Sequence, residues 1–208
     1  MASFVSDLGA ANAAKNMPKL KMPPGCRDVT SQHGGTVFAL VGVGSGMAAS
    51  DDTLRRVALH EAGHAVVGRL LKIKCAGASI IPDGRGYEGS AVVAGHHTLH
   101  RDLIERGQYQ DFLSSVYLKI MVTIAGSEAE KIAGFDDADL GGDDRAHVLD
   151  LCQRYSISDA TVEDLRHRTH SLLVQHFHKV EAVAQALLAS PSRSLTGDAI
   201  DALLKSSR

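Results

Sequence analysis

The chain of 208 residues is long enough for one main domain with a sizeable core. Its 22 Lys and Arg residues against 24 Asp and Glu residues leave a net charge of −2, which argues against a nucleic-acid-binding protein. Hydrophobic residues make up 44% of the chain and aromatic residues only 4%, so we expect a core built mostly from aliphatic side chains.

Two regions are predicted along the chain: an N-terminal arm at residues 1–50 and one domain at residues 51–208. The arm is rich in Asn, Ser, Lys and Gly and contains a Pro-Pro-Gly turn at residues 23–25. Its start lacks a basic region followed by an apolar one, so no secretory signal is predicted. The chain contains no run of eighteen or more apolar residues, so we expect no membrane span.

A helix of about five turns is predicted from Thr53 to Leu71. Ser50 can cap its start, and Asp51 and Asp52 favour the positive end of the helix dipole. Apolar residues recur at helical spacing, namely Leu54, Val57, Ala58, Ala62, Ala65, Val66 and Leu70. This helix contains the run His60-Glu61-Ala62-Gly63-His64, which is an HExxH motif.

The HExxH motif predicts a zinc centre that hydrolyses amide bonds. Residues i and i+4 lie one turn apart on the same face of a helix, so His60 and His64 can bind one Zn²⁺ from the same side. Glu61 can then take a proton from a metal-bound water. Gly63 costs about 1 kcal/mol against Ala inside a helix, and the close approach of another segment near the metal would account for it.

A catalytic zinc usually has three protein ligands, so a third must come from elsewhere in the chain. The extended HExxHxxGxxH pattern is excluded, because Val67 and Leu70 stand where that pattern needs Gly and His. Glu88 is a poor candidate, since it lies in a Gly-rich, turn-like stretch. The remaining candidates lie in an acidic run in which Asp143 or Asp144 can open a helix. Spacing alone leaves two interpretations open, a metal ligand and an ordinary helix cap.

Two short strands are predicted at residues 79–82 and 90–94, joined by a Gly-rich turn. Zinc peptidases often hold their substrate as an added strand on an exposed sheet edge. Our candidate for that edge is the second strand, with Ser90, Ala91, Val92, Val93 and Ala94. A hairpin that serves only stability is the alternative. A surface or substrate-cleft position is assigned to His96, His97 and His100.

Three further helices are predicted: at residues 108–133, after the Gly141-Gly142 turn, and at residues 158–189. In the first of these, apolar side chains repeat every four residues, which indicates core packing: Phe112, Val116, Ile120 and Ile124. The histidines of the last helix do not share one face at i, i+4 spacing. Solvent exposure is therefore predicted for His167, His170, His176 and His178.

These motifs together resemble the peptidase domain of the FtsH-type (M41) zinc metallopeptidases. The similar segments follow HEAGH in the family's order: 78–87 (VTIIPRG…GY), 125–132 (GGRxAEE), 140–144 (TxGAxND), and 178–188 with 195–200 (the closing helices). The resemblance spans roughly residues 53–205. It implies a mainly α fold with a small β-hairpin or sheet and with HExxH on a core helix.

The resemblance also implies the complete ligand set. The family's third ligand is the Asp of its ND pair, which corresponds to Asp144 here, and Asp143 stands in place of the Asn. Glu130 matches a family glutamate close to the metal and is expected to orient a ligand histidine. His147, one helical turn after Asp144, is the alternative third ligand. Departures from the family pattern that affect the wall of the site are Ala125, Ser127 and Leu140.

The resemblance and the motif together predict an ATP-independent zinc metalloendopeptidase that cleaves peptides or unfolded proteins. FtsH-type proteins carry an AAA ATPase and a membrane anchor, whereas this sequence contains no GxxxxGK[ST] phosphate loop. Expected partners are further copies of the chain, in a hexamer or a smaller oligomer, or a separate ATPase. The alternatives are a catalytically silent binding or regulatory module of an FtsH-like assembly and a zinc hydrolase of a non-peptide amide. Three cysteines without CxxC spacing indicate a reducing compartment, which we take to be the cytoplasm.

Overall fold

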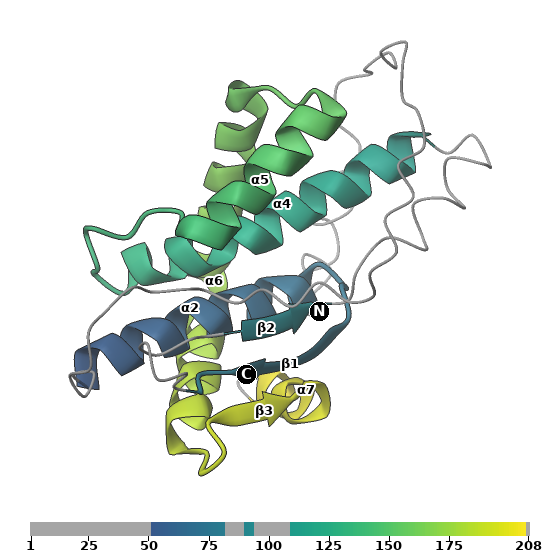
Figure 1. Cartoon of the computed structure of the whole chain (residues 1–208). Helices are drawn as coiled ribbons and strands as arrows, with labels where there is room; N and C mark the ends of the chain where they lie inside the picture. Colours follow the sequence, from purple (N-terminus) through teal and green to yellow (C-terminus); the bar gives the residue numbers. More distant parts are fainter. Residues whose placement is uncertain (1–50, 82–89, 94–108, 207–208) are drawn as a thin grey trace, which may run out of the picture.

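A computed structural model describes residues 51–81, 90–93 and 109–206 of the chain. In chain order its elements are α2 (Asp51–Leu70), β1 (Cys75–Ser79), β2 (Ser90–Val93), α4 (Tyr109–Ile132), α5 (Gly142–Tyr155), α6 (Asp159–Ala189), β3 (Ser194–Thr196) and α7 (Gly197–Ser206). The described elements form a mainly helical structure with one small antiparallel sheet, which confirms the predicted class of fold (Figure 1). The N-terminal arm, Glu88, Ala94 and the histidines at 96, 97 and 100 lie outside the described residues.

Helix α2 lies at the centre of this structure, between a layer of helices and the sheet (Figure 1). Helix α4 packs along one side of it with α5 beyond, the sheet lies on the other side, and α6 packs against both α2 and α4. The segment from Ala58 to Gly68 is buried without interruption. A helix buried on every side has no solvent-facing stripe, so the polar side chains of the HExxH motif must find their partners inside the protein.

Gly63 allows the backbones of α2 and α4 to come into direct contact. A Cβ atom at this position would lie 2.6 Å from the carbonyl oxygen of Ala125 and 2.8 Å from the Cβ of Ala129. Both neighbours belong to α4 and are fully buried. The expectation that Gly63 marks the close approach of another segment is therefore confirmed.

The sheet has the strand order β2-β1-β3, so β2 is an edge strand of the described sheet. The first strand begins at Cys75 and ends at Ser79, and the predicted strand at residues 79–82 was therefore placed about four residues too late. Gly77 of β1 has no room for a side chain against β3, because a Cβ there would come 2.5 Å from the carbonyl oxygen of Leu195. Two β-branched residues follow the strand, Ile80, which is buried, and Ile81, which is 52% exposed.

Helix α4 carries the core contacts that its four-residue repeat predicted. Its Phe112, Val116, Ile120 and Ile124 are each at most 2% exposed. They form a second hydrophobic cluster with Val148 and Leu151 of α5 and Leu165 of α6. Within the described ranges, no helix is long and apolar enough to cross a membrane.

Helix α6 begins after Ser158, whose side chain accepts a hydrogen bond from the backbone N–H of Thr161. His176 has non-helical backbone angles (φ −122°, ψ 17°), so the element is two helices joined at a kink. The single predicted helix at residues 158–189 was therefore correct in its ends and wrong in its continuity. The exposure predicted for the α6 histidines is confirmed for His167, His170 and His178, whereas His176 is half-buried. His170, although 47% exposed, also contacts a buried glutamate.

That glutamate, Glu128 of α4, forms the main ionic connection between α4 and α6. Its side chain is only 4% exposed. Its Oε1 accepts hydrogen bonds from Arg166 (2.9 Å) and Lys131 (3.0 Å), and its Oε2 lies 3.0 Å from Nδ1 of His170. Burial by itself raises the pKa of Glu128, but its three partners together hold that pKa below the ordinary value of 4.5.

Glu128→Gln should lower the free energy of unfolding at pH 7 by roughly 1–3 kcal/mol, because three basic side chains that are 22–47% exposed lose their buried counter-charge. A carboxyl group with a lowered folded-state pKa stabilises the fold above its unfolded pKa and loses that contribution as the pH falls. The difference in unfolding free energy between variant and wild type should therefore shrink as the pH falls below about 4.5. Chemical denaturation curves recorded at several pH values measure this difference.

The matched control is Glu163→Gln, since Glu163 contacts the same Arg166 but is 57% exposed, and it should change stability little. An unchanged gap between Glu128→Gln and wild type at pH 3.5 and pH 7 would contradict the role given to Glu128.

Candidate metal centre

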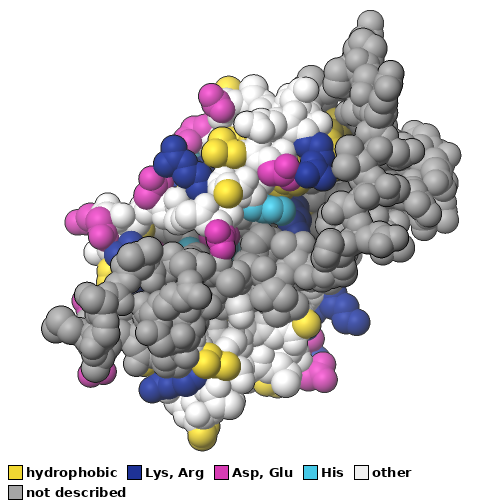
Figure 2. All heavy atoms as spheres, in the orientation of Figure 1, with side chains coloured by type: hydrophobic (Ala, Val, Ile, Leu, Met, Phe, Trp, Pro, Cys, Tyr) yellow, Lys and Arg dark blue, Asp and Glu magenta, His cyan; other side chains and the backbone are white. Residues whose placement is uncertain are grey.

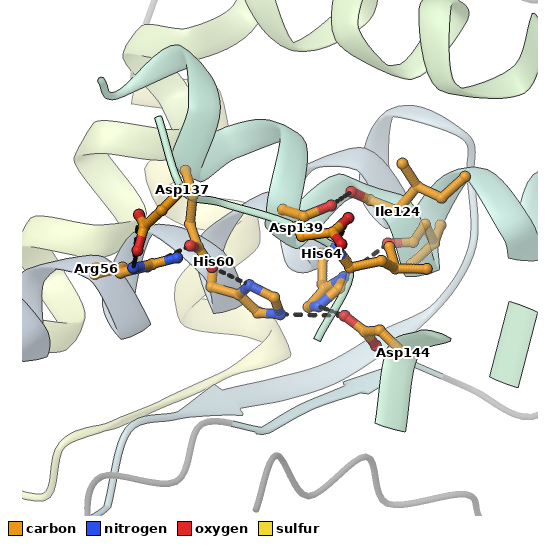
Figure 3. A network of polar contacts seen from close by, with 11 residues as sticks. Arg56, His60, His64, Ile124, Asp137, Asp139 and Asp144 are labelled. Carbon is orange, nitrogen blue, oxygen red and sulfur yellow. Dashed lines mark hydrogen bonds and ion pairs between the residues drawn. The ribbon is translucent and has the colours of Figure 1, made fainter. Parts of the chain in front are cut away.

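Helices α2, α4 and α5 bring a compact group of polar side chains together. His60 and His64 come from α2, Asp144 comes from the first turn of α5, and Glu130 comes from the last part of α4. The Oδ2 atom of Asp144 lies 3.2 Å from Nε2 of His60 and 3.3 Å from Nε2 of His64 (Figure 3). Among the described residues, His60, His64 and Asp144 form the group whose ligand atoms could surround one metal ion.

Both imidazole rings are oriented by hydrogen bonds at Nδ1. His64 Nδ1 donates to the carbonyl oxygen of Val122, at 2.7 Å, which requires a proton on Nδ1. His60 Nδ1 lies 2.5 Å from Oε1 of Glu130 and donates to that carboxylate. Both rings therefore keep Nε2 for the side that faces Asp144, which is the arrangement that metal-ligating histidines use.

The two distances from Asp144 to the histidine nitrogens fit a tetrahedral metal ion, and all three ligand atoms lie within 4.8 Å of one another. Zinc bonds to His nitrogen and carboxylate oxygen are about 2.0–2.2 Å long, so two tetrahedral ligands lie about 3.3–3.5 Å apart. The two measured edges, 3.2 and 3.3 Å, are close to that value. Two imidazoles and one carboxylate are also a ligand set that zinc accepts.

The buried carboxylates of the centre can be balanced by a cation or by protons on the imidazoles. His60, Glu61, His64, Glu130 and Asp144 are all buried, with exposures between 2% and 7%. Burial alone lowers the pKa of His60, but hydrogen bonds with Asp144 and Glu130 raise it to about 10. Burial also opposes the charged form of Asp144, yet the two histidines hold its pKa well below the usual range. Protons on the imidazoles balance the carboxylates in the metal-free chain, and metal binding releases such protons.

Glu61 lies beside the ligand group on α2 and is 2% exposed. Burial raises the pKa of its carboxyl group, although the neighbouring histidines act in the opposite direction. The structure thus places Glu61 in the same buried environment as the two histidines of the motif.

Asp144 does not cap α5. The N-cap residue is Gly141, which makes no side-chain cap hydrogen bond, and the carboxylate of Asp144 points to the histidines instead. Its neighbour Asp143 is exposed. His147, the alternative ligand, is not part of the ligand group. Burial and the nearby Lys119 lower the pKa of His147 to about 4.

Two residues that support the centre were not predicted from the sequence. A Cβ at Gly126 would come within 2.5–2.6 Å of the His60 ring, so only glycine lets that ring lie against α4. Arg56 of α2 lies beside Glu130, with its Nε 2.5 Å from Oε2. The position of Arg56, four residues before His60, was an available signal, because this spacing puts both on one face of the helix.

The candidate substrate edge lies on the sheet side of α2. Ser90 to Val93 form strand β2, which pairs with β1 on one side and contacts α2. In the space-filling view, histidine side chains are visible on the face drawn, near acidic and basic side chains (Figure 2).

Comparison of the sequence with protein-family models and with curated proteins finds no match. The family resemblance therefore stays a prediction from the sequence motifs.

Asp144→Ala should reduce the zinc content of the purified protein from about one equivalent to a small fraction, because two histidines alone are a weak site. Elemental analysis after dialysis against trace zinc is the measurement. Asp143→Ala is the matched control, since it removes an exposed carboxylate from the adjacent position and should keep the wild-type zinc content. Equal zinc content in the two variants would remove Asp144 from the ligand set.

Proposed function

We propose that this protein is a zinc metalloendopeptidase of the FtsH (M41) type, which hydrolyses peptide bonds in peptides or unfolded proteins. The observation that carries the proposal is the buried group of His60, His64 and Asp144. Glu61 lies beside this group, on the same helix as the two histidines. The Nδ1 hydrogen bonds of both histidines support it, because they leave each Nε2 to face the same point.

In this proposal His60, His64 and Asp144 would hold the metal ion. Bound zinc would supply a Lewis acid for the peptide carbonyl and would lower the pKa of a water molecule to about 7. Glu61 accepts the proton of the attacking water and later passes it to the leaving amine. Glu130 keeps the His60 ring in place by accepting the Nδ1–H.

Strand β2, from Ser90 to Val93, is the proposed binding edge for an extended substrate. The sequence prediction also included Ala94, which lies outside the described residues. The place of β2 at the edge of the described sheet and its contact with α2 support this assignment. A strand added there would pair through main-chain hydrogen bonds, which depend little on the side chains of the substrate. The proposed partners are further copies of the chain or a separate ATPase that delivers unfolded chains.

Glu61→Gln should retain zinc and the fold while losing cleavage of casein, tested without nucleotide, by a factor of about 100 or more, because the amide cannot accept the proton. Glu181→Gln, an exposed change of the same kind on α6, is the control and should keep wild-type activity. Full activity in Glu61→Gln would refute the mechanism.

Two other results would refute the proposal and favour a different function. A zinc-loaded wild type that cleaves no peptide or protein would favour a silent binding or regulatory module. Hydrolysis of small amides without any cleavage of peptides would favour a non-peptide amidohydrolase.

A further inference from the structure

Arg56 contacts two parts of the chain that border the candidate metal centre. It lies one helical turn before His60 on α2, and its side chain is 32% exposed. Its guanidinium reaches out of α2 to two other parts of the chain. One is the end of α4, through Glu130, and the other is the connection from α4 to α5, through Asp137 (Figure 3).

The first contact acts on the His60 ring. Glu130 uses one oxygen for each neighbour: Oε1 accepts from Nδ1 of His60, and Oε2 accepts from Nε of Arg56, both at 2.5 Å. With both oxygens occupied, the carboxylate of Glu130 is held in one orientation. Arg56 therefore helps to set the direction in which Nε2 of His60 points.

The second contact acts on the segment that leads to Asp144. Nη1 of Arg56 donates to both carboxylate oxygens of Asp137, at 3.1 Å each. The guanidinium also lies 5.4 Å from the centre of the Phe135 ring. Phe135 and Asp137 belong to the connection at residues 133–141, which leads directly into the first turn of α5. Arg56 thus anchors the chain seven residues before Asp144 (144 − 137 = 7).

We propose that Arg56 is a positioning residue that couples the orientation of His60 to the placement of Asp144 and so raises the metal affinity of the centre. This inference rests on the metal centre of the proposed function, but not on the reaction. The guanidinium is suited to the task because its planar fork can contact two carboxylates at once, whereas a lysine offers a single point charge.

The test measures zinc affinity by competition with a chromophoric chelator, together with the visible spectrum of the cobalt-substituted protein. Arg56→Ala should bind zinc about 10–100-fold more weakly, the loss typical of residues that support a ligand, and should change the cobalt spectrum. Arg56→Lys should recover part of the affinity, since an ammonium can still reach one carboxylate.

The chain offers a close control in Arg55, the adjacent arginine. It lies 5.7 Å from the same Phe135 ring, is exposed, and has the same charge. Arg55→Ala should keep the wild-type zinc affinity within about twofold, which separates the specific contacts of Arg56 from the general loss of a positive charge.

A second variant tests the coupling without disturbing Glu130. Asp137 is 78% exposed, so Asp137→Asn is expected to fold, and it should weaken zinc binding by a few-fold. In the double variant Arg56→Ala/Asp137→Asn, zinc affinity should equal that of Arg56→Ala, because both changes break the same connection.

Unchanged zinc affinity and an unchanged cobalt spectrum in Arg56→Ala would overturn the inference, even if thermal unfolding of the metal-free protein showed a loss of stability. Equal weakening by Arg55→Ala would overturn it as well. A wild type that binds no zinc would refute both this inference and the metal centre. Zinc binding that depends on Arg56 in a protein without peptidase activity would support the inference and refute the proposed reaction.

Discussion

The close packing of α2 against α4 is the constraint on which the rest of the candidate site depends. Neither Gly63 nor Gly126 could carry a Cβ atom at the observed separation of the two helices. At this separation α4 supplies the acceptors for both histidines: the Glu130 carboxylate for His60 and the Val122 carbonyl for His64. With both rings held through Nδ1, Asp144 completes the group by reaching a single point between the two Nε2 atoms.

The electrostatics of the centre follow from the same packing. Three carboxylates and two imidazoles are buried together, which is costly unless opposite charges accompany them. The guanidinium of Arg56 compensates Glu130 from the outer side. A divalent cation among the ligand atoms would compensate Asp144 and Glu61 from the inner side, and it would take the place of the protons that the raised pKa of His60 keeps on the ring.

The parts of the fold that the sequence predicted well have a strong local signal. Both ends of helix α4 lie within one residue of the predicted boundaries, because apolar side chains repeat through it every four residues. Strand β1 was misplaced since its small residues, Cys-Ala-Gly-Ala-Ser, have no β-branched character, and only its pairing with β2 and β3 makes it a strand. Strand β3 was not predicted as a strand because it is only three residues long. The kink at His176 also lacks a local cause, since neither Pro nor Gly occurs at that point.

The sequence by itself determined the helix that carries HExxH and the face that His60 and His64 share, because a spacing of four residues on a helix is a local property. It also supplied Asp144 as a candidate through a motif resemblance, while spacing alone left a helix cap equally open. The tertiary structure excluded the helix cap, because it directs that carboxylate to the two Nε2 atoms, 80 residues beyond His64 in the chain (144 − 64 = 80). It likewise gave Gly126 and Arg56 their roles, because close helix contacts and shared carboxylates arise only when α2, α4 and α5 pack together.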